Sequence, residues 1–107
     1  MGEIITYKSS PISKYCQMKF GDGDRILISV ARSGIKIVKL KWAGLVPSET
    51  IFQISTADLF SDNYKFARGR LTERSFALDM LDVFKEIFLK LDSLNEVKEE
   101  LNLIFVK

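Results

Sequence analysis

The apolar residues of this 107-residue chain change their spacing about halfway along it, and this change restricts the folds that the chain can adopt. In residues 15–20 they alternate with polar ones, so that Cys16, Met18 and Phe20 fall on one face. From Phe76 onward they recur every three or four positions, as along one side of a helix. Alternation is typical of a half-buried strand, so the sequence predicts strands first and helices afterwards.

Turn-forming residues divide the first half of the chain into short strand-like segments. The Gly and Asp residues at 21–24 can adopt positive φ or bond their own backbone, and Ser33-Gly34 suits a tight hairpin connection. An apolar loop over 43–48 is expected before the last strand, and a weaker N-terminal strand precedes Pro11. The predicted strands are residues 3–7, 15–20, 25–32, 34–42 and 49–55.

The second half is predicted to form two helices. Thr72 can cap the first, and the Ser93–Glu96 pattern fits a capping box that starts the second. Most apolar residues of the first helix share one wide arc, with Leu78 and Leu89 outside it. On the second helix the shared side carries Leu94, Val97, Leu101 and Ile104, and whether residues 103–106 continue it or form a strand stays open.

Together these patterns predict one α+β domain spanning residues 1–107. We expect a twisted antiparallel meander of four or five strands over about residues 3–55, packed against a long helix in the C-terminal half and a short final helix. A loop over 56–71 connects the sheet to helices at about 73–91 and 94–104.

The strand at 34–42 keeps a period of two, but its phase slips between Ile37 and Val38. A β-bulge formed by these two residues would let the apolar residues on both sides of the slip face the core. Lys36, Lys39 and Lys41 would then share the solvent face. The alternative is a bent strand whose apolar residues change faces.

The residue types argue against catalysis. The chain contains no histidine, which removes the usual general base and the commonest metal ligand. Its single cysteine, Cys16, rules out an intramolecular disulfide and is expected to be buried. The carboxylates of the first helix, Asp79, Asp82 and Glu86, are expected on its solvated face. We therefore expect no enzyme, no cofactor and no metal site.

Positive charge gathers in the sheet half of the chain. Two basic groups follow. One is a ridge of Arg32, Lys36, Lys39 and Lys41, and the other lies around the start of the helix capped by Thr72, with Arg68 and Arg70 just before the cap and Arg74 in the first turn. The ridge suits either a guard against strand aggregation or contact with nucleic acid, and the guard role is favoured because no aromatic residue is expected beside these lysines. The loop arginines suit an anion, or ion pairs with nearby aspartates.

Apolar residues outside the expected core suggest a partner surface. Those of the loop before the last strand can fold back onto the core or form an exposed knob. Self-association is expected, because the sheet has open edges and the C-terminal tail is apolar. The leading hypothesis is a cytoplasmic, non-catalytic, homo-oligomeric protein-binding module without a membrane span; the alternative binds nucleic acid or an anionic ligand. The predicted partner-binding residues are Trp42, Leu45, Val46, Pro47, Leu78 and Leu89.

Overall fold

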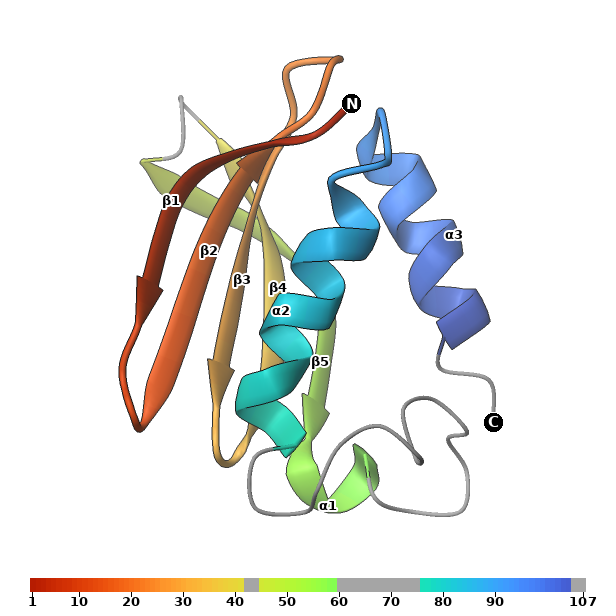
Figure 1. Cartoon of the computed structure of the whole chain (residues 1–107). Helices are drawn as coiled ribbons and strands as arrows, with labels where there is room; N and C mark the ends of the chain where they lie inside the picture. Colours follow the sequence, from red (N-terminus) through yellow and green to blue (C-terminus); the bar gives the residue numbers. More distant parts are fainter. Residues whose placement is uncertain (42–44, 60–75, 105–107) are drawn as a thin grey trace.

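Five strands form one antiparallel sheet in the order of the chain (Figure 1). The computed structural model describes residues 1–41, 45–59 and 76–104, with side chains at all of these except 59, 76–79 and 104. The α+β class and the meander predicted from the sequence are confirmed. The strands are β1 (Glu3–Ser9), β2 (Ser13–Lys19), β3 (Arg25–Ala31), β4 (Gly34–Lys41) and β5 (Val46–Ser55).

The two longer helices lie together on one side of the sheet (Figure 1). They are α2 (Phe76–Phe88) and α3 (Leu94–Ile104), and a single helical turn that the sequence did not predict, α1 (Thr56–Leu59), follows β5 directly. The expected start of the first helix at residue 73 lies outside the described residues, and its end comes at Phe88 rather than 91. Leu103 and Ile104 belong to α3, while 105 and 106 lie outside the described residues.

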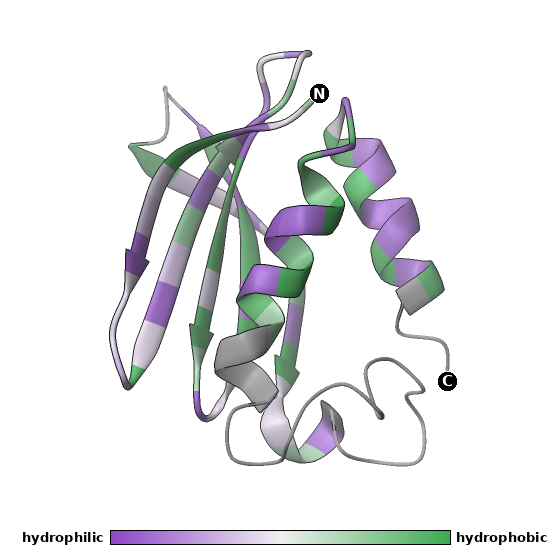
Figure 2. Ribbon diagram, in the orientation of Figure 1, coloured by the Kyte–Doolittle hydropathy of each residue, from purple (hydrophilic) through white to green (hydrophobic). Residues whose placement is uncertain are grey.

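The core lies between the sheet and these helices. Along β2 and β3 the side chains alternate between buried and partly exposed, which matches the banded hydropathy of these strands in Figure 2. Phe84 and Phe88 of α2 are fully buried, and their rings stack with centroids 5.5 Å apart. The buried residues of this cluster are Cys16, Met18, Phe20, Ile26, Ile28, Val30, Ile35, Ile37, Ile54, Met80, Leu81, Phe84, Phe88, Leu94, Val97 and Leu101.

The β-bulge predicted at Ile37 and Val38 of β4 is wrong, because the extra residues lie in β5. The β3–β4 ladder continues without interruption, with Ile28 opposite Ile37 and Leu27 opposite Val38. Two register shifts lie between β4 and β5. Ile37 faces Phe52 and Val38 faces Thr50, so Ile51 of β5 is an extra residue, and Ser48 is a second one between the partners of Lys39 and Leu40. Because β4 stays regular, its apolar residues change faces at the slip, as the bent-strand alternative expected.

The predicted position of Leu89 is also wrong. Expected on the outside of a continuous helix, it is partly buried and packs against the core. The physical reason is that α2 ends at Phe88, and the chain then turns toward α3 with Leu91 N–H donating to the Phe88 carbonyl at 3.1 Å. The predicted serine cap of α3 is present, since Glu96 N–H donates to Ser93 Oγ at 3.3 Å. The second bond of the predicted capping box differs, because Glu96 Oε2 accepts from Asp92 N–H, one residue before the Ser93 amide.

Candidate functional site

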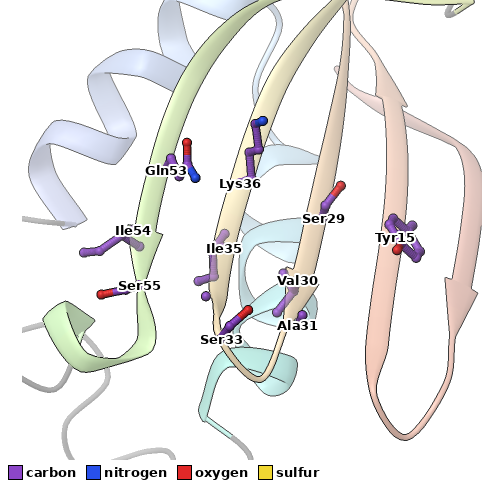
Figure 3. A pocket seen from close by; sticks show the side chains of 11 residues that line it. Tyr15, Ser29, Val30, Ala31, Ser33, Ile35, Lys36, Gln53, Ile54 and Ser55 are labelled. Carbon is purple, nitrogen blue, oxygen red and sulfur yellow. The ribbon is translucent and has the colours of Figure 1, made fainter.

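The face of the sheet opposite the helices presents a continuous polar row. Directly paired residues of an antiparallel ladder share a face, and Tyr15, Ser29, Lys36 and Gln53 are paired in succession across β2 to β5. Lys8 of β1, opposite Tyr15, completes the row. Figure 3 shows the first four side chains on the side turned away from α2. We call these five residues the outer row.

An open hollow of about 290 Å³ lies along the outer row. Tyr15, Ser29, Lys36 and Gln53 line it together with residues at the nearby strand ends, including Ser33. A second hollow, on the other side of Tyr15, is lined by Lys8, Ser9, Ser10, Ser13 and Tyr15. Hydroxyl groups and the ammonium groups of Lys8 and Lys36 therefore surround the phenol ring of Tyr15, which is 46% exposed.

The predicted basic ridge is not brought together by the structure. Lys36 belongs to the outer row, whereas Lys39 lies opposite the buried Ile26 and so on the helix side of the sheet. Its ammonium lies 3.9 Å from a carboxylate oxygen of Asp24. Arg32 is exposed in the β3–β4 turn, and Lys41, at the end of β4, alternates onto the side of Lys39. The expectation that no aromatic residue accompanies these lysines is wrong for Lys36, because Tyr15 shares its face.

The free edge of the sheet at β1 is a second candidate surface. All seven residues of β1 are exposed, and among the described strands only β2 pairs with it, on one side. The side chains of Ile4, Ile5 and Tyr7 are between 39% and 42% exposed. A register shift between Ile4 and Thr6 makes Ile5 the extra residue of a β-bulge in this edge strand.

A polar cluster joins this edge to α2, and the sequence did not predict it. The Tyr7 hydroxyl donates to Asp82 Oδ1 at 3.0 Å, and the Lys14 ammonium donates to Asp82 Oδ2 at 3.2 Å. Lys85 Nζ lies 3.5 Å from Asp82 Oδ1 and 4.5 Å from the centre of the Tyr7 ring. Asp82 was expected on a solvated helix face; instead, it is partly buried because β1 and β2 extend beside that face.

Competing effects set the pKa of Asp82. Burial raises the pKa of this carboxyl, but the hydrogen bonds from Tyr7 and Lys14 and the charges of Lys14 and Lys85 outweigh burial and hold it below its usual value. Beneath the cluster, burial raises the pKa of the Cys16 thiol to about 11, although the charge of Lys85 opposes the rise. A thiol held neutral and fully buried is a poor nucleophile, as the sequence analysis expected for Cys16.

The structure places only some of the other predicted site residues. Arg68, Arg70, Arg74 and Trp42 lie outside the described residues, as does the side chain of Leu78. Leu45, Val46 and Pro47 are exposed, which contradicts the interpretation that they fold back onto the core. Val46 and Pro47 belong to β5 rather than to a loop, because they continue the ladder with Lys41 and Leu40.

The described part of the chain offers no group of three or more Cys, Asp or Glu side chains placed to hold a metal ion. None of the described helices is long and apolar enough to cross a membrane. No family model, no curated protein and no solved structure matches the chain.

Proposed function

We propose that this protein is a non-catalytic protein-interaction module that associates with itself. The observation that supports the proposal is the free edge at β1, where exposed apolar side chains accompany unpaired backbone groups. Such an edge is a template for another strand, and adding one would cover the apolar surface of Ile4, Ile5 and Tyr7. The rigid sheet and the two helices behind it would hold this edge in place.

Light scattering of the full chain tests this proposal. At micromolar concentration we expect a mass about twice the 12.2 kDa of one chain. Ile5→Lys should shift the protein toward the monomer, because it adds a charge at the centre of the edge. Ile12→Lys is the matched control, since Ile12 is 69% exposed but lies in the β1–β2 turn. A monomeric wild-type protein would refute the proposal.

A second candidate function rests on the outer row. Lys8 and Lys36 lie in the same row as Tyr15 and on either side of it. Proteins that bind single-stranded nucleic acids use such an arrangement, in which bases stack on the aromatic ring and the cations contact phosphates. This row supports binding of a single-stranded nucleic acid. It shares only Lys36 with the basic ridge predicted from the sequence, since Arg32, Lys39 and Lys41 lie outside the outer row.

Fluorescence anisotropy with a labelled oligonucleotide of mixed sequence tests this candidate. Two phosphate contacts should give a slope of log K against log salt of roughly −1.4. Tyr15→Ala and Lys36→Gln should each weaken binding, whereas Lys39→Gln, which removes a cation from the helix side, should not. Equal loss from Lys36→Gln and Lys39→Gln would show binding by general charge and would refute a site on the outer row.

A further inference from the structure

We propose that β1 pairs with β1 of a second copy, antiparallel about a two-fold axis, with Glu3 of each copy opposite Lys8 of the other. This inference rests on the proposed self-association and adds the register in which the two edges meet. An isologous contact of this kind closes after two copies, so it uses the free edge without leading to a filament.

The β-bulge in β1 brings Glu3 and Lys8 onto one face of the sheet. Glu3 lies opposite Lys19 and Lys8 lies opposite Tyr15, whereas Ile4 and Tyr7 lie opposite the fully buried Met18 and Cys16. In a regular strand, residues five positions apart would point to opposite faces. The extra residue, Ile5, shifts the alternation by one position, so Glu3 and Lys8 both reach the outer face.

In the proposed register, opposed side chains of the two copies lie on the same face of the sheet. Directly opposite residues of an antiparallel pair must share a face. With Glu3 opposite Lys8, Ile4 comes opposite Tyr7, and both of these side chains lie on the helix side. The bulged Ile5 comes opposite Thr6 at the two-fold axis. The two charged residues of β1, one of each sign, are thereby paired twice in each dimer.

The backbone hydrogen bonding of β1 also supports this register. Ser10 N–H donates to the Ser13 carbonyl at 2.9 Å, which makes these two residues a hydrogen-bonded pair at the turn. Hydrogen-bonded pairs alternate with non-bonded pairs along an antiparallel ladder. Counting back from Ser10, the backbone N–H and C=O of Lys8 therefore point toward β2, and those of Tyr7 point toward the free edge. Tyr7 can therefore bond the second copy. Lys8 then occupies a non-bonded position, where opposing side chains lie closest together.

Two other two-fold registers lack this complementarity. Placing Tyr7 opposite Tyr7 puts Lys8 opposite Thr6 and leaves Glu3 without a charged partner. Placing Lys8 opposite Lys8 brings two like charges together, which destabilises an antiparallel pair. The register with Glu3 opposite Lys8 is therefore favoured by both charge and face.

Charge reversal tests the register. We expect Glu3→Lys and Lys8→Glu each to weaken the dimer about tenfold in sedimentation experiments at low salt, because each replaces two attractive pairs by two repulsive ones. The double variant should restore the dimer to within about threefold of wild type. Lys90→Glu makes the same charge change as Lys8→Glu, on an exposed residue after α2, and should leave the dimer unchanged.

Disulfide trapping provides a second readout. Separately purified Glu3→Cys and Lys8→Cys variants should cross-link when mixed under mild oxidation, since opposed Cα atoms of a non-bonded pair lie about 4.5 Å apart. Neither variant should cross-link alone, and the buried Cys16 should not interfere. Thermal melts of each variant would confirm that it is folded.

The outcomes separate the two proposals. A wild-type monomer overturns both self-association and the register. A dimer that tolerates both single charge reversals, or that the double reversal does not restore, overturns the register alone. Cross-linking of Lys8→Cys with itself, without cross-linking in the mixture, also overturns the register.

Discussion

At position 34, close packing and not backbone conformation requires a glycine. The sequence suggested that this glycine serves the hairpin turn, but it is the first residue of β4, paired with Ala31. A Cβ atom built at Gly34 would lie 2.2 Å from the carbonyl oxygen of Ile54. The glycine is needed because β5 passes too close for any side chain. The left-handed conformation belongs instead to Gly23, with φ of 91° in the β2–β3 turn.

Gly34→Ala should therefore destabilise the protein. The obstacle is backbone of the neighbouring strand, which cannot rotate away, so we expect a loss of about 1–3 kcal/mol in the free energy of unfolding. Urea denaturation measures this loss. Gly21→Ala is the control, since its Cβ would meet the Asp92 carbonyl oxygen at an ordinary 3.7 Å. Equal losses from the two variants would contradict the role assigned to Gly34.

Asp82 should make stability depend on acid pH. Its pKa is held below its ordinary value of 3.8 in the folded protein, so it stabilises the fold fully above that value. The contribution is lost as pH falls through the lowered pKa. Asp82→Asn should lower the urea midpoint at pH 7 and should flatten its decline on acidification. Glu86→Gln, on an exposed residue of the same helix, should leave the acid decline as steep as in wild type.

At the scale of elements, local sequence predicted most of what the structure contains. The strands, the Ser93 cap of α3 and the buried side of α3 follow from alternation, turn residues and helical spacing, which are properties of neighbours along the chain. The position of the bulge did not follow. Ile37 and Val38 signal a change of phase, but only the pairing with β5 determines that Ile51 is the extra residue.

Ser93→Ala should weaken α3 by about 1 kcal/mol, because the amide of Glu96 loses its hydrogen-bond acceptor at the start of the helix. Ser93→Asp should retain most of the stability, since aspartate can accept the same bond and suits the helix dipole. Thermal unfolding followed by circular dichroism would compare the three proteins. An alanine variant as stable as wild type would show that the cap contributes little beyond the packing of Leu94, Val97 and Leu101.

At the scale of the whole molecule, the candidate surfaces depend on contacts between distant segments. The outer row takes one residue from each strand, so paired neighbours in the row lie seven to 17 positions apart along the chain. No local pattern marks Tyr15 as a neighbour of both Lys8 and Ser29. The sequence placed lysines on strands but grouped them along one strand, whereas the sheet groups Lys8 and Lys36 across strands.

Association through β1 should couple dimer formation to folding of the whole chain. If the native state is a dimer, mass action makes the melting temperature rise with protein concentration, because a tenfold increase favours association by about 1.4 kcal/mol. We expect a rise of roughly 2–4 °C per tenfold concentration, since that free energy is divided by the unfolding entropy of two chains. Differential scanning calorimetry over a hundredfold range measures it. The melting temperature of Lys8→Glu should rise less steeply with concentration than that of wild type, and that of Lys90→Glu should rise equally steeply. Identical slopes for all three proteins would mean that the charged ends of β1 do not couple association to folding.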